Sequence, residues 1–252
     1  MISGLIITFN EEKHIKSVIE NIDFVDEVII VDSNSSDKTI EIINSFPHVK
    51  LVQRNFDDFT SQRNFALSLA NNEWILFIDA DERVTEGLKN EILEITSKKS
   101  NISAFYFYRK FMYKNKPLHF SGWQTDKNFR LFKKSKCSYV SERLVHETLQ
   151  VNGEIGILKN KLIHYSFDDY KKYKSKMISY GKLRAKELFL KGKKYNVFVH
   201  FLKPTYKFLY DYFIRLGFLD GKRGIIICYL NALSVYSRYP ELKRLHLENK
   251  NK

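Results

Sequence analysis

Short apolar runs alternate with amphipathic stretches through the first third of the chain. Residues 4–9 (GLIITF) and 27–32 (EVIIVD) are rich in β-branched side chains. The interval between them has the length of a helix and contains His14, Val18 and Ile19. This order predicts a strand, a helix and a second strand.

The same alternation continues further along the chain. Ser35, Ser36 and Asp37 can cap a helix that begins just after them. A strand, a helix and another strand are predicted next, over residues 49–54, 61–70 and 73–81. Continuous apolar strands separated by helices indicate an α/β fold with a mostly parallel central sheet that is covered on both faces.

Beyond Glu94 the alternation is lost. Residues 103–118 and 129–140 have the pattern of strands with exposed basic positions, whereas the chain from about Asp168 onward has helical spacing. Within that region we expect helical segments around 198–216, interrupted by Pro204, and over 225–236.

We therefore expect two parts. The first is a domain over residues 1–165, in which the alternating half ends at about residue 95 and a strand-rich half follows at about 96–165. The second is a basic, aromatic-rich helical extension over residues 166–252. At 252 residues, the chain is long enough for one large core with an appendage, and too short for two large independent domains.

Charge is unevenly distributed between these parts. Residues 1–158 contain 20 Lys and Arg against 22 Asp and Glu, whereas residues 159–252 contain 22 against 7. A basic C-terminal part suits nucleic acid, an anionic lipid surface or a phosphorylated acceptor, and charge alone does not choose among them.

Several classes of protein are disfavoured. The N-terminus lacks the basic start and small-residue cleavage site of a signal peptide. The apolar run at residues 225–230 is far shorter than the roughly 20 residues that cross a bilayer. Cys137 and Cys228 are too few for a disulfide framework, so we expect a cytoplasmic protein.

Polar residues follow three of the predicted strands, at 8–12, 32–37 and 79–82. In a sheet of this kind ligands bind at the carboxyl ends of the strands. Asp32 is placed to accept hydrogen bonds from a ribose or a base, and its alternative is an ordinary turn aspartate. Thr8 and Asn10 suit hydrogen bonds to a base, and their alternative is a pair of helix caps.

Asp79 and Asp81 lie in the segment IDADE, two positions apart. In an extended backbone both carboxylates would project from one face. Their mutual repulsion would be relieved by Mg²⁺ or Mn²⁺, which takes one or two carboxylates together with the oxygens of a substrate diphosphate. The competing interpretation is a solvated acidic turn before a helix that begins near Thr85.

Glycine is nearly absent from this half of the chain, since Gly4 is the only one in residues 1–86. Neither GxGxxG nor GxxxxGK[ST] occurs, so no glycine-rich loop can cradle phosphates. A nucleotide site without such a loop must neutralise its diphosphate in another way. A cation bound to Asp81, together with the nearby Arg63, would do so. A dinucleotide dehydrogenase or a P-loop enzyme is therefore disfavoured.

At this point the sequence resembles a known family. The segments GLIITFNEEKHI, VIIVDSNSSDKT, QRNFAL and WILFIDADE, in this order and spacing, resemble the family-2 inverting glycosyltransferases of GT-A fold. The later segments FSGWQTDKNFRLF, RLVHE and FLDGKRG are similar to the subgroup that contains lipopolysaccharide and lipooligosaccharide core β-1,4-glucosyltransferases.

The resemblance implies roles for individual residues. It places Thr8, Asn10 and Glu11 in the nucleotide pocket, with Asp32 on the uracil or ribose of a UDP-sugar. Arg63 would lie near the base or the diphosphate. Asp79 would contact the ribose or the metal, and Asp81 would bind Mg²⁺ or Mn²⁺ directly.

The sequence differs from the family pattern at the base that deprotonates the acceptor hydroxyl. The family often carries this acid in an ED pair. Here the nearest equivalent is VHE, with Glu147 as the preferred base and Asp126 as its competitor. His146 is a candidate contact to metal or phosphate. Trp123 could stack on a sugar face, and Arg130 could touch acceptor or diphosphate.

The resemblance implies transfer of glucose or a related hexose from a UDP-sugar to a lipid-linked saccharide or lipopolysaccharide-core acceptor. It makes residues 1–165 the catalytic domain, with a nucleotide-sugar half at about 1–95 and an acceptor half at about 96–165. The interleaved aromatic and basic residues of 195–218 are typical of helices that lie in a lipid headgroup layer, and the alternative is that the aromatics pack on the catalytic core while the lysines are solvated. Together with the resemblance, this segment predicts a peripheral protein on the inner, anionic face of the bacterial plasma membrane.

Two alternatives remain at this stage: a sugar nucleotidyltransferase, and a non-catalytic basic protein that binds lipid or nucleic acid. The first normally carries an N-terminal glycine-rich loop, which is missing here. For the second, no nucleic-acid partner is expected, because the sequence has no recognisable helix-turn-helix, zinc or RNA-recognition motif.

Overall fold

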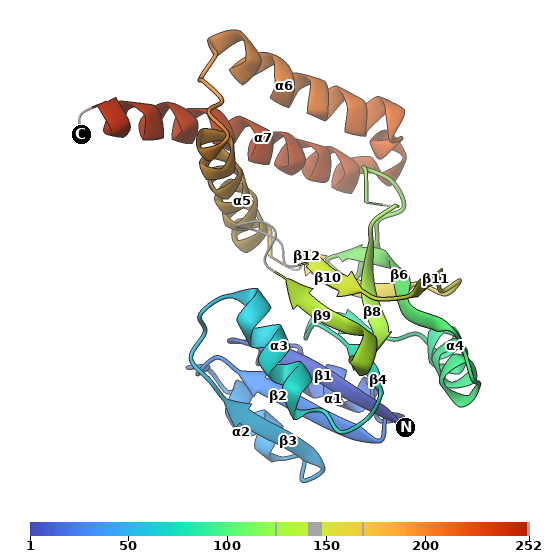
Figure 1. Ribbon diagram of the computed structural model, residues 1–252. Helices are drawn as coiled ribbons and strands as arrows, with labels where there is room; N and C mark the ends of the chain where they lie inside the picture. Colours follow the sequence, from blue (N-terminus) through green and yellow to red (C-terminus); the bar gives the residue numbers. More distant parts are fainter. Residues whose placement is uncertain (124, 141–147, 168, 251–252) are drawn as a thin grey trace. The chain divides into compact units, whose positions relative to one another are not determined.

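The computed structural model describes residues 1–123, 125–140, 148–167 and 169–250 (Figure 1). The chain divides into two compact units. The first contains residues 1–109 and 126–164, and the second contains residues 110–125 and 165–252. Residues 110–125, which fall in the acceptor half expected from the sequence, thus belong to the second unit.

The first unit begins with four parallel strands, in the spatial order β3-β2-β1-β4. Their bounds are Ile2–Thr8 for β1, Glu27–Asp32 for β2, Val49–Gln53 for β3 and Trp74–Phe77 for β4. The α/β class and the parallel start of the sheet, expected for a GT-A domain, are confirmed.

Strands from the middle of the chain extend the sheet in mixed directions. β8 (Lys127–Lys133) is antiparallel to both β4 and β6 (Ile102–Tyr113), and β11 (Glu154–Ile157) is parallel to β6. β12 (Leu162–Phe167) pairs with the short β5 (Glu82–Arg83). β9 (Cys137–Val140), preceded by a 3₁₀ turn at Lys134–Lys136, pairs with β10 (Thr148–Val151) in a separate ribbon.

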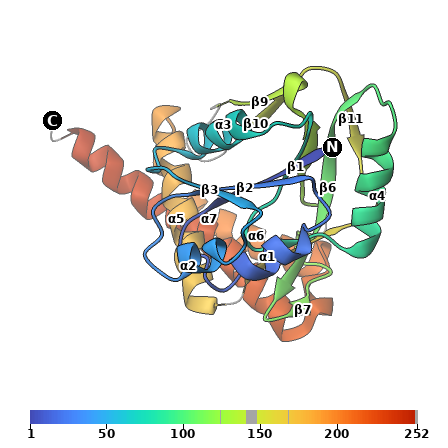
Figure 2. The ribbon, with the colours of Figure 1, turned by 90° about the horizontal axis from the view of Figure 1, so that it is seen from below.

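Helices cover both faces of the parallel strands (Figure 2). Because side chains alternate along a strand, Ile6 and Ile30 pack with α1 (Ile15–Asn21) and α2 (Thr39–Asn44), whereas Leu5 and Ile29 pack with α3 (Phe59–Leu69). α4 (Glu86–Ser97) joins the first of these clusters and is capped by Thr85, whose hydroxyl accepts from the Leu88 N–H. The strands are therefore buried on both faces.

The second unit is mainly helical. Its helices are α5 (Tyr170–Leu190), α6 (Val197–Leu209), a π-helical turn (Tyr210–Ile214), a 3₁₀ turn (Gly217–Asp220) and α7 (Gly221–Lys250), and β7 (Lys116–Pro117) pairs with the end of β6. Both α5 and α6 pack on α7. The expected C-terminal helical extension is confirmed.

Pro204 does not interrupt its helix, contrary to the expectation from sequence. α6 continues through it, and the irregularity comes later, at the π-helical turn that begins at Tyr210. Pro204 is buried on the same side of the helix as His200. The packing of that side outweighs the loss of one backbone hydrogen bond at the proline.

Two close contacts organise this unit. A Cβ atom at Gly181 of α5 would lie 2.4 Å from the backbone oxygen of Ser234 in α7, so the two helices meet almost backbone to backbone. Asp220 is buried, and its carboxylate accepts from the backbone N–H groups of His119 and Phe120 at 3.0 and 2.9 Å. That carboxylate fixes the loop that leads to Trp123.

Each unit holds one cysteine, Cys137 in the first and Cys228 in the second, and both are free and buried. Among the described residues, no helix combines the length and the apolar character that crossing a membrane would require.

Candidate active site

The carboxyl ends of β1 and β2 lie side by side, with Thr8 and Asp32 in register. Asp32 is completely buried, and its carboxylate accepts from the Ser35 backbone N–H at 2.8 Å and from the Ser35 hydroxyl at 2.5 Å. Thr8 is buried as well, and its hydroxyl has no hydrogen-bond partner among the described residues. A buried hydroxyl of this kind is costly unless a ligand satisfies it.

The loops that follow these strands are tied to each other by side chains. Asn10 adopts a left-handed backbone conformation, with φ of 56°, and its side-chain oxygen accepts from the Ser36 N–H at 2.8 Å. The backbone N–H of Glu11 donates to the Thr39 hydroxyl, also at 2.8 Å. The side-chain oxygen of Asn10 thus ties the loop after β1 to the loop after β2.

Asp79 follows β4 and lies between two guanidinium groups. Arg63 of α3 donates to its Oδ1 at 3.0 Å, and Arg130 of β8 donates to its Oδ2. Burial by itself would raise the pKa of Asp79, but the two arginines outweigh it and hold that pKa well below the usual range. The Arg63 guanidinium also lies over the ring of Phe77, 4.6 Å from its centroid.

Glu82 is completely buried and extends the network of charges. Its Oε1 accepts from Arg130 at 2.8 Å and lies 3.5 Å from Nη1 of Arg109, while its Oε2 accepts from the Asp79 backbone N–H. Arg109 of β6 also pairs with Asp126, through Nε at 2.6 Å and Nη2 at 2.5 Å, and both contacts fall on Oδ2. Three arginines and three carboxylates therefore share one network.

Asp81 contacts a different partner. Its Oδ2 lies 3.1 Å from Nε2 of His164, which comes from β12. The extended conformation expected for the DAD segment is not observed, because the N–H of Glu82 donates to the carbonyl of Asp79 and closes a turn. The two aspartates consequently serve different neighbours.

The set of candidate metal ligands is small. No three histidine, cysteine or carboxylate side chains converge within the described ranges in a way that could hold a metal ion. Asp81 and His164 nevertheless supply one oxygen and one nitrogen, 3.1 Å apart. Two neighbouring ligands of one octahedral cation lie about 3 Å from each other, so this pair fits Mg²⁺ or Mn²⁺ with further ligands from a substrate.

Three candidates remain, Trp123, His146 and Glu147. Trp123 belongs to the second unit, where it packs on Phe111 with ring centroids 4.8 Å apart. Glu147 and His146 lie outside the described residues.

Arg109 and His164 are not singled out by the sequence pattern, and Glu82 enters it only as the last residue of the polar segment 79–82. Glu82 carries a signal in retrospect, since an acid directly before Arg83 and Val84 continues the polar end of an apolar strand. His164 sits in the alternating segment LIHYSF, which is typical of a strand. Neither pattern indicates which distant side chain the residue will contact.

The sequence matches the model of the family "Glycosyl transferase family 2" over residues 3–147. An uncharacterised glycosyltransferase from Rickettsia felis is 31% identical, over 99% of this chain and 92% of its own length. The lipopolysaccharide core biosynthesis glycosyltransferase LpsC of Rhizobium meliloti is 25% identical, over 94% of this chain and 93% of its own length.

Among solved structures, Staphylococcus aureus TarS 1–349 in complex with UDP is similar with a TM-score of 0.49 and 15% sequence identity, over 98% of this chain and 91% of that one. The family match covers more than half of this chain, and the Rickettsia relative covers nearly all of it. The chain therefore belongs to glycosyl transferase family 2.

Proposed function

We propose that the protein is an inverting, metal-dependent hexosyltransferase. It would move glucose or a related hexose from a UDP-sugar to a lipid-linked or lipopolysaccharide-core acceptor at the cytoplasmic face of the membrane. The observation that carries the proposal is the edge of the sheet where Asp32 and the unsatisfied Thr8 hydroxyl adjoin. This edge suits a nucleoside, which brings both donors and acceptors.

Asp32 would bind the uridine part of the donor. Its two oxygens accept from Ser35, but a carboxylate has about four acceptor positions, so capacity is left for a ribose hydroxyl or the uracil N–H. The Thr8 hydroxyl would complete the recognition by pairing with a polar atom of the nucleoside. Asn10 and Glu11 would shape the wall through the contacts of their loop.

The arginines of the network already form ion pairs with carboxylates, so a donor diphosphate would need another source of positive charge. Arg63, Arg109 and Arg130 are matched by Asp79, Glu82 and Asp126, so the network as a whole is close to neutral. A donor diphosphate arriving beside Asp81 would add negative charge without a compensating cation. Asp81 and His164 would hold that divalent cation, which would stabilise the charge of the leaving UDP.

Glu147 and Asp126 are the two candidates for the base that deprotonates the acceptor hydroxyl. Asp126 receives two donors of Arg109 on Oδ2, an arrangement that suits a carboxylate which positions its neighbours. We therefore retain Glu147 as the proposed base and give Asp126 a positioning role. Arg130 would support the diphosphate side through Asp79, and Trp123 and His146 remain proposed contacts to acceptor or phosphate.

Calorimetry with UDP, GDP, CDP and TDP tests the donor. UDP should bind most tightly, and Asp32→Asn should weaken UDP binding because the variant loses a charged acceptor. If another nucleotide binds more tightly to the wild-type protein, the assignment of the donor is wrong.

A pair of variants tests the base. Glu147→Gln should retain affinity for the UDP-sugar and lose transfer by roughly 10²-fold or more, because a positioned base typically contributes about 10² to 10⁴ in rate. Asp126→Asn should mainly weaken substrate binding. A larger transfer defect in Asp126→Asn, with donor affinity intact, would exchange the two roles.

A further inference from the structure

Helix α6 has a buried side and an exposed side, and the exposed side is apolar. Its inward side carries His200 and Pro204, which are buried, and Asp211 continues the same side in the π-helical turn. α6 packs on α7. A helix at the surface of a globular protein normally turns charged residues to the other side.

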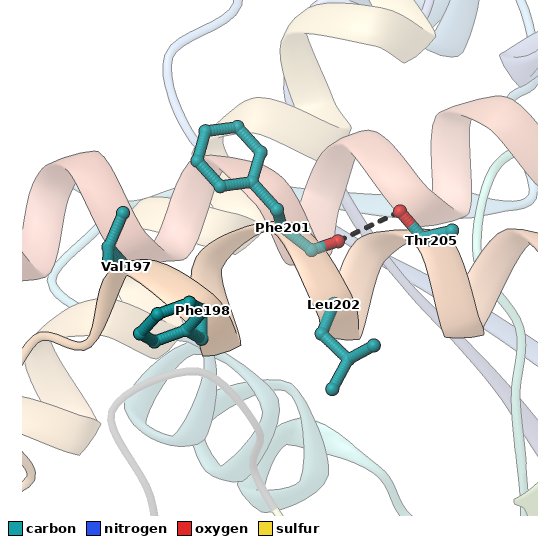
Figure 3. A pocket seen from close by; sticks show the side chains of 5 residues that line it. All are labelled: Val197, Phe198, Phe201, Leu202 and Thr205. Carbon is teal, nitrogen blue, oxygen red and sulfur yellow. Dashed lines mark hydrogen bonds between the residues drawn. The ribbon is translucent and has the colours of Figure 1, made fainter.

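The outward side of α6 instead carries large apolar residues that are exposed. Phe198 is 80% exposed, and Leu202, one helical turn later, is 68% exposed. The residues that line the open depression on this helix are Val197, Phe198, Phe201, Leu202 and Thr205 (Figure 3). We call the outward surface of residues 197–219 the apolar face; its other exposed members are Tyr206, Leu209, Phe213, Ile214, Leu216, Phe218 and Leu219.

The charges along this segment have a single sign at the surface. Between Leu188 and Pro240 the sequence has nine lysines and arginines, and only two acids, Asp211 and Asp220. Both acids are buried. Asp211 accepts from Lys207 and from Asn231, each at 2.9 Å, and Asp220 binds the backbone of His119 and Phe120. Every exposed charge within this stretch of sequence is therefore positive.

α5 provides an internal comparison, because it packs on the same α7. Its exposed positions are mostly polar or basic, including Lys171, Lys172 and Lys176. α5 thus follows the usual amphipathic pattern. Large exposed apolar residues also occur singly on α5 and α7, but they follow one another most densely along α6 and the turns after it.

We infer that residues 197–219 form an in-plane anchor that inserts its apolar face into the headgroup layer of an anionic phospholipid membrane. The inference deepens the proposed function, on which its biological purpose rests, by naming the segment that meets the lipid. α6 has 13 residues, which at 1.5 Å per residue is about 20 Å. This length is too short to cross the roughly 30 Å hydrocarbon core of a bilayer, so the helix would lie along the interface.

Charge decides between lipid and a second copy of this chain. If the apolar faces of two copies met, the cations near one face would be brought close to those near the other. Their repulsion costs free energy at ordinary ionic strength. An anionic lipid surface attracts the same cations and accepts the apolar side chains between them. The positive charge of this segment therefore favours lipid.

Vesicle binding tests the inference directly. The full-length protein should co-sediment with vesicles of phosphatidylcholine and phosphatidylglycerol in a 7:3 ratio, and not with phosphatidylcholine alone. Phe198→Ser combined with Leu202→Ser should weaken this partition at least 10-fold. The matched control is Ile155→Ser combined with Leu247→Ser, two residues with 49% and 53% exposure outside the face, which should bind as wild type does.

Insertion is measured with an environment-sensitive fluorophore on Leu202→Cys, compared with Leu247→Cys. The label at position 202 should shift to shorter wavelength on anionic vesicles, and the label at 247 should not. A label at 202 that stays in water while the protein sediments would place docking elsewhere and overturn the inference. Equal binding of the Ser variant and wild type, or dimerisation through this face without vesicle binding, would also overturn it.

The outcome is separable from that of the proposed function. Vesicle binding requires no turnover, and UDP binding is measured without vesicles. If UDP binding fails in the wild-type protein while the label at position 202 inserts, the proposed donor is wrong and the anchor stands. If UDP binds normally and the label does not insert, the anchor is wrong and the donor stands.

Discussion

The first unit contains a network of buried, paired charges, whereas the charges of the second unit are mostly exposed and lie among exposed apolar residues. Arg130 and Glu82 are 3% and 0% exposed and contact each other, while Phe198 is 80% exposed in a segment whose exposed charges are all positive. Buried ion pairs hold catalytic groups in fixed positions, and exposed apolar residues are available to a partner surface. The proposed site and the proposed membrane anchor therefore lie in separate parts of one short chain.

The largest effect is expected on turnover, from the loss of the Asp81 carboxylate in the first unit. Asp81→Asn should lower metal-dependent turnover by about 10³-fold, because losing a cation that stabilises the leaving group removes several kcal/mol of transition-state stabilisation. Single-turnover transfer with Mg²⁺ or Mn²⁺ measures it. Asp57→Asn, an exposed aspartate paired with Arg54, is the matched control and should keep full activity. Undiminished wild-type activity in excess chelator would remove the metal from the proposal.

The second prediction contrasts buried and exposed arginines. Arg130→Met should lower the free energy of unfolding by about 3–5 kcal/mol, since it leaves the buried carboxylate of Glu82 and the partly exposed carboxylate of Asp79 short of a partner. Arg244→Gln in α7 also breaks two ion pairs, with Glu241 and Glu248, but Arg244 is 52% exposed. Urea unfolding should show almost no change for the latter. Equal losses in the two variants would contradict the comparison between units.

The third prediction concerns the packing of the second unit. Gly181→Val should destabilise the protein by about 1–3 kcal/mol more than Ser179→Val does, because overpacking forces α5 away from the Ser234 backbone. Ser179 is exposed on the same helix, so valine there meets no such clash. Helix propensity alone would favour Gly181→Val, because glycine is the poorer helix former, so a loss of stability at position 181 reports the clash. Thermal unfolding of both variants measures the difference. Equal stability would mean that α5 and α7 can separate freely.

The smallest effect is the pH dependence of the second unit. His200 is enclosed by Tyr195, Phe201, Tyr236 and Tyr239, and burial lowers its pKa. Because its folded pKa is below its unfolded one, its contribution to stability is fully present above about pH 6.5 and decreases as the pH falls.

Urea midpoints of wild type and His200→Gln between pH 5 and 8 test this prediction. The variant should have the flatter profile. Parallel profiles would show that His200 is not the group responsible.

The first half of the site could be predicted from sequence because each residue directly follows an apolar run. Asp32 ends β2 and Asp79 follows β4, and parallel strands bring their carboxyl ends to one edge. The sequence pattern also predicts the helical second unit, since its apolar residues recur at helical spacing.

The partners of those carboxylates could not be predicted. Arg109, Arg130 and His164 come from β6, β8 and β12, whose pairing register decides which side chain reaches the site. A shift of one residue would turn each side chain to the opposite face of the sheet. Local pattern does not fix that register, because these strands are joined over long loops.

The buried cysteines give each unit its own chemical reporter. Burial raises the pKa of the Cys137 thiol to about 12 and that of Cys228 to about 11, so at neutral pH almost no thiolate is present to react. Alkylation of either cysteine consequently requires that its unit open first. The rates at which a thiol reagent modifies Cys137 and Cys228 would measure the opening of the two units separately, within a single native protein.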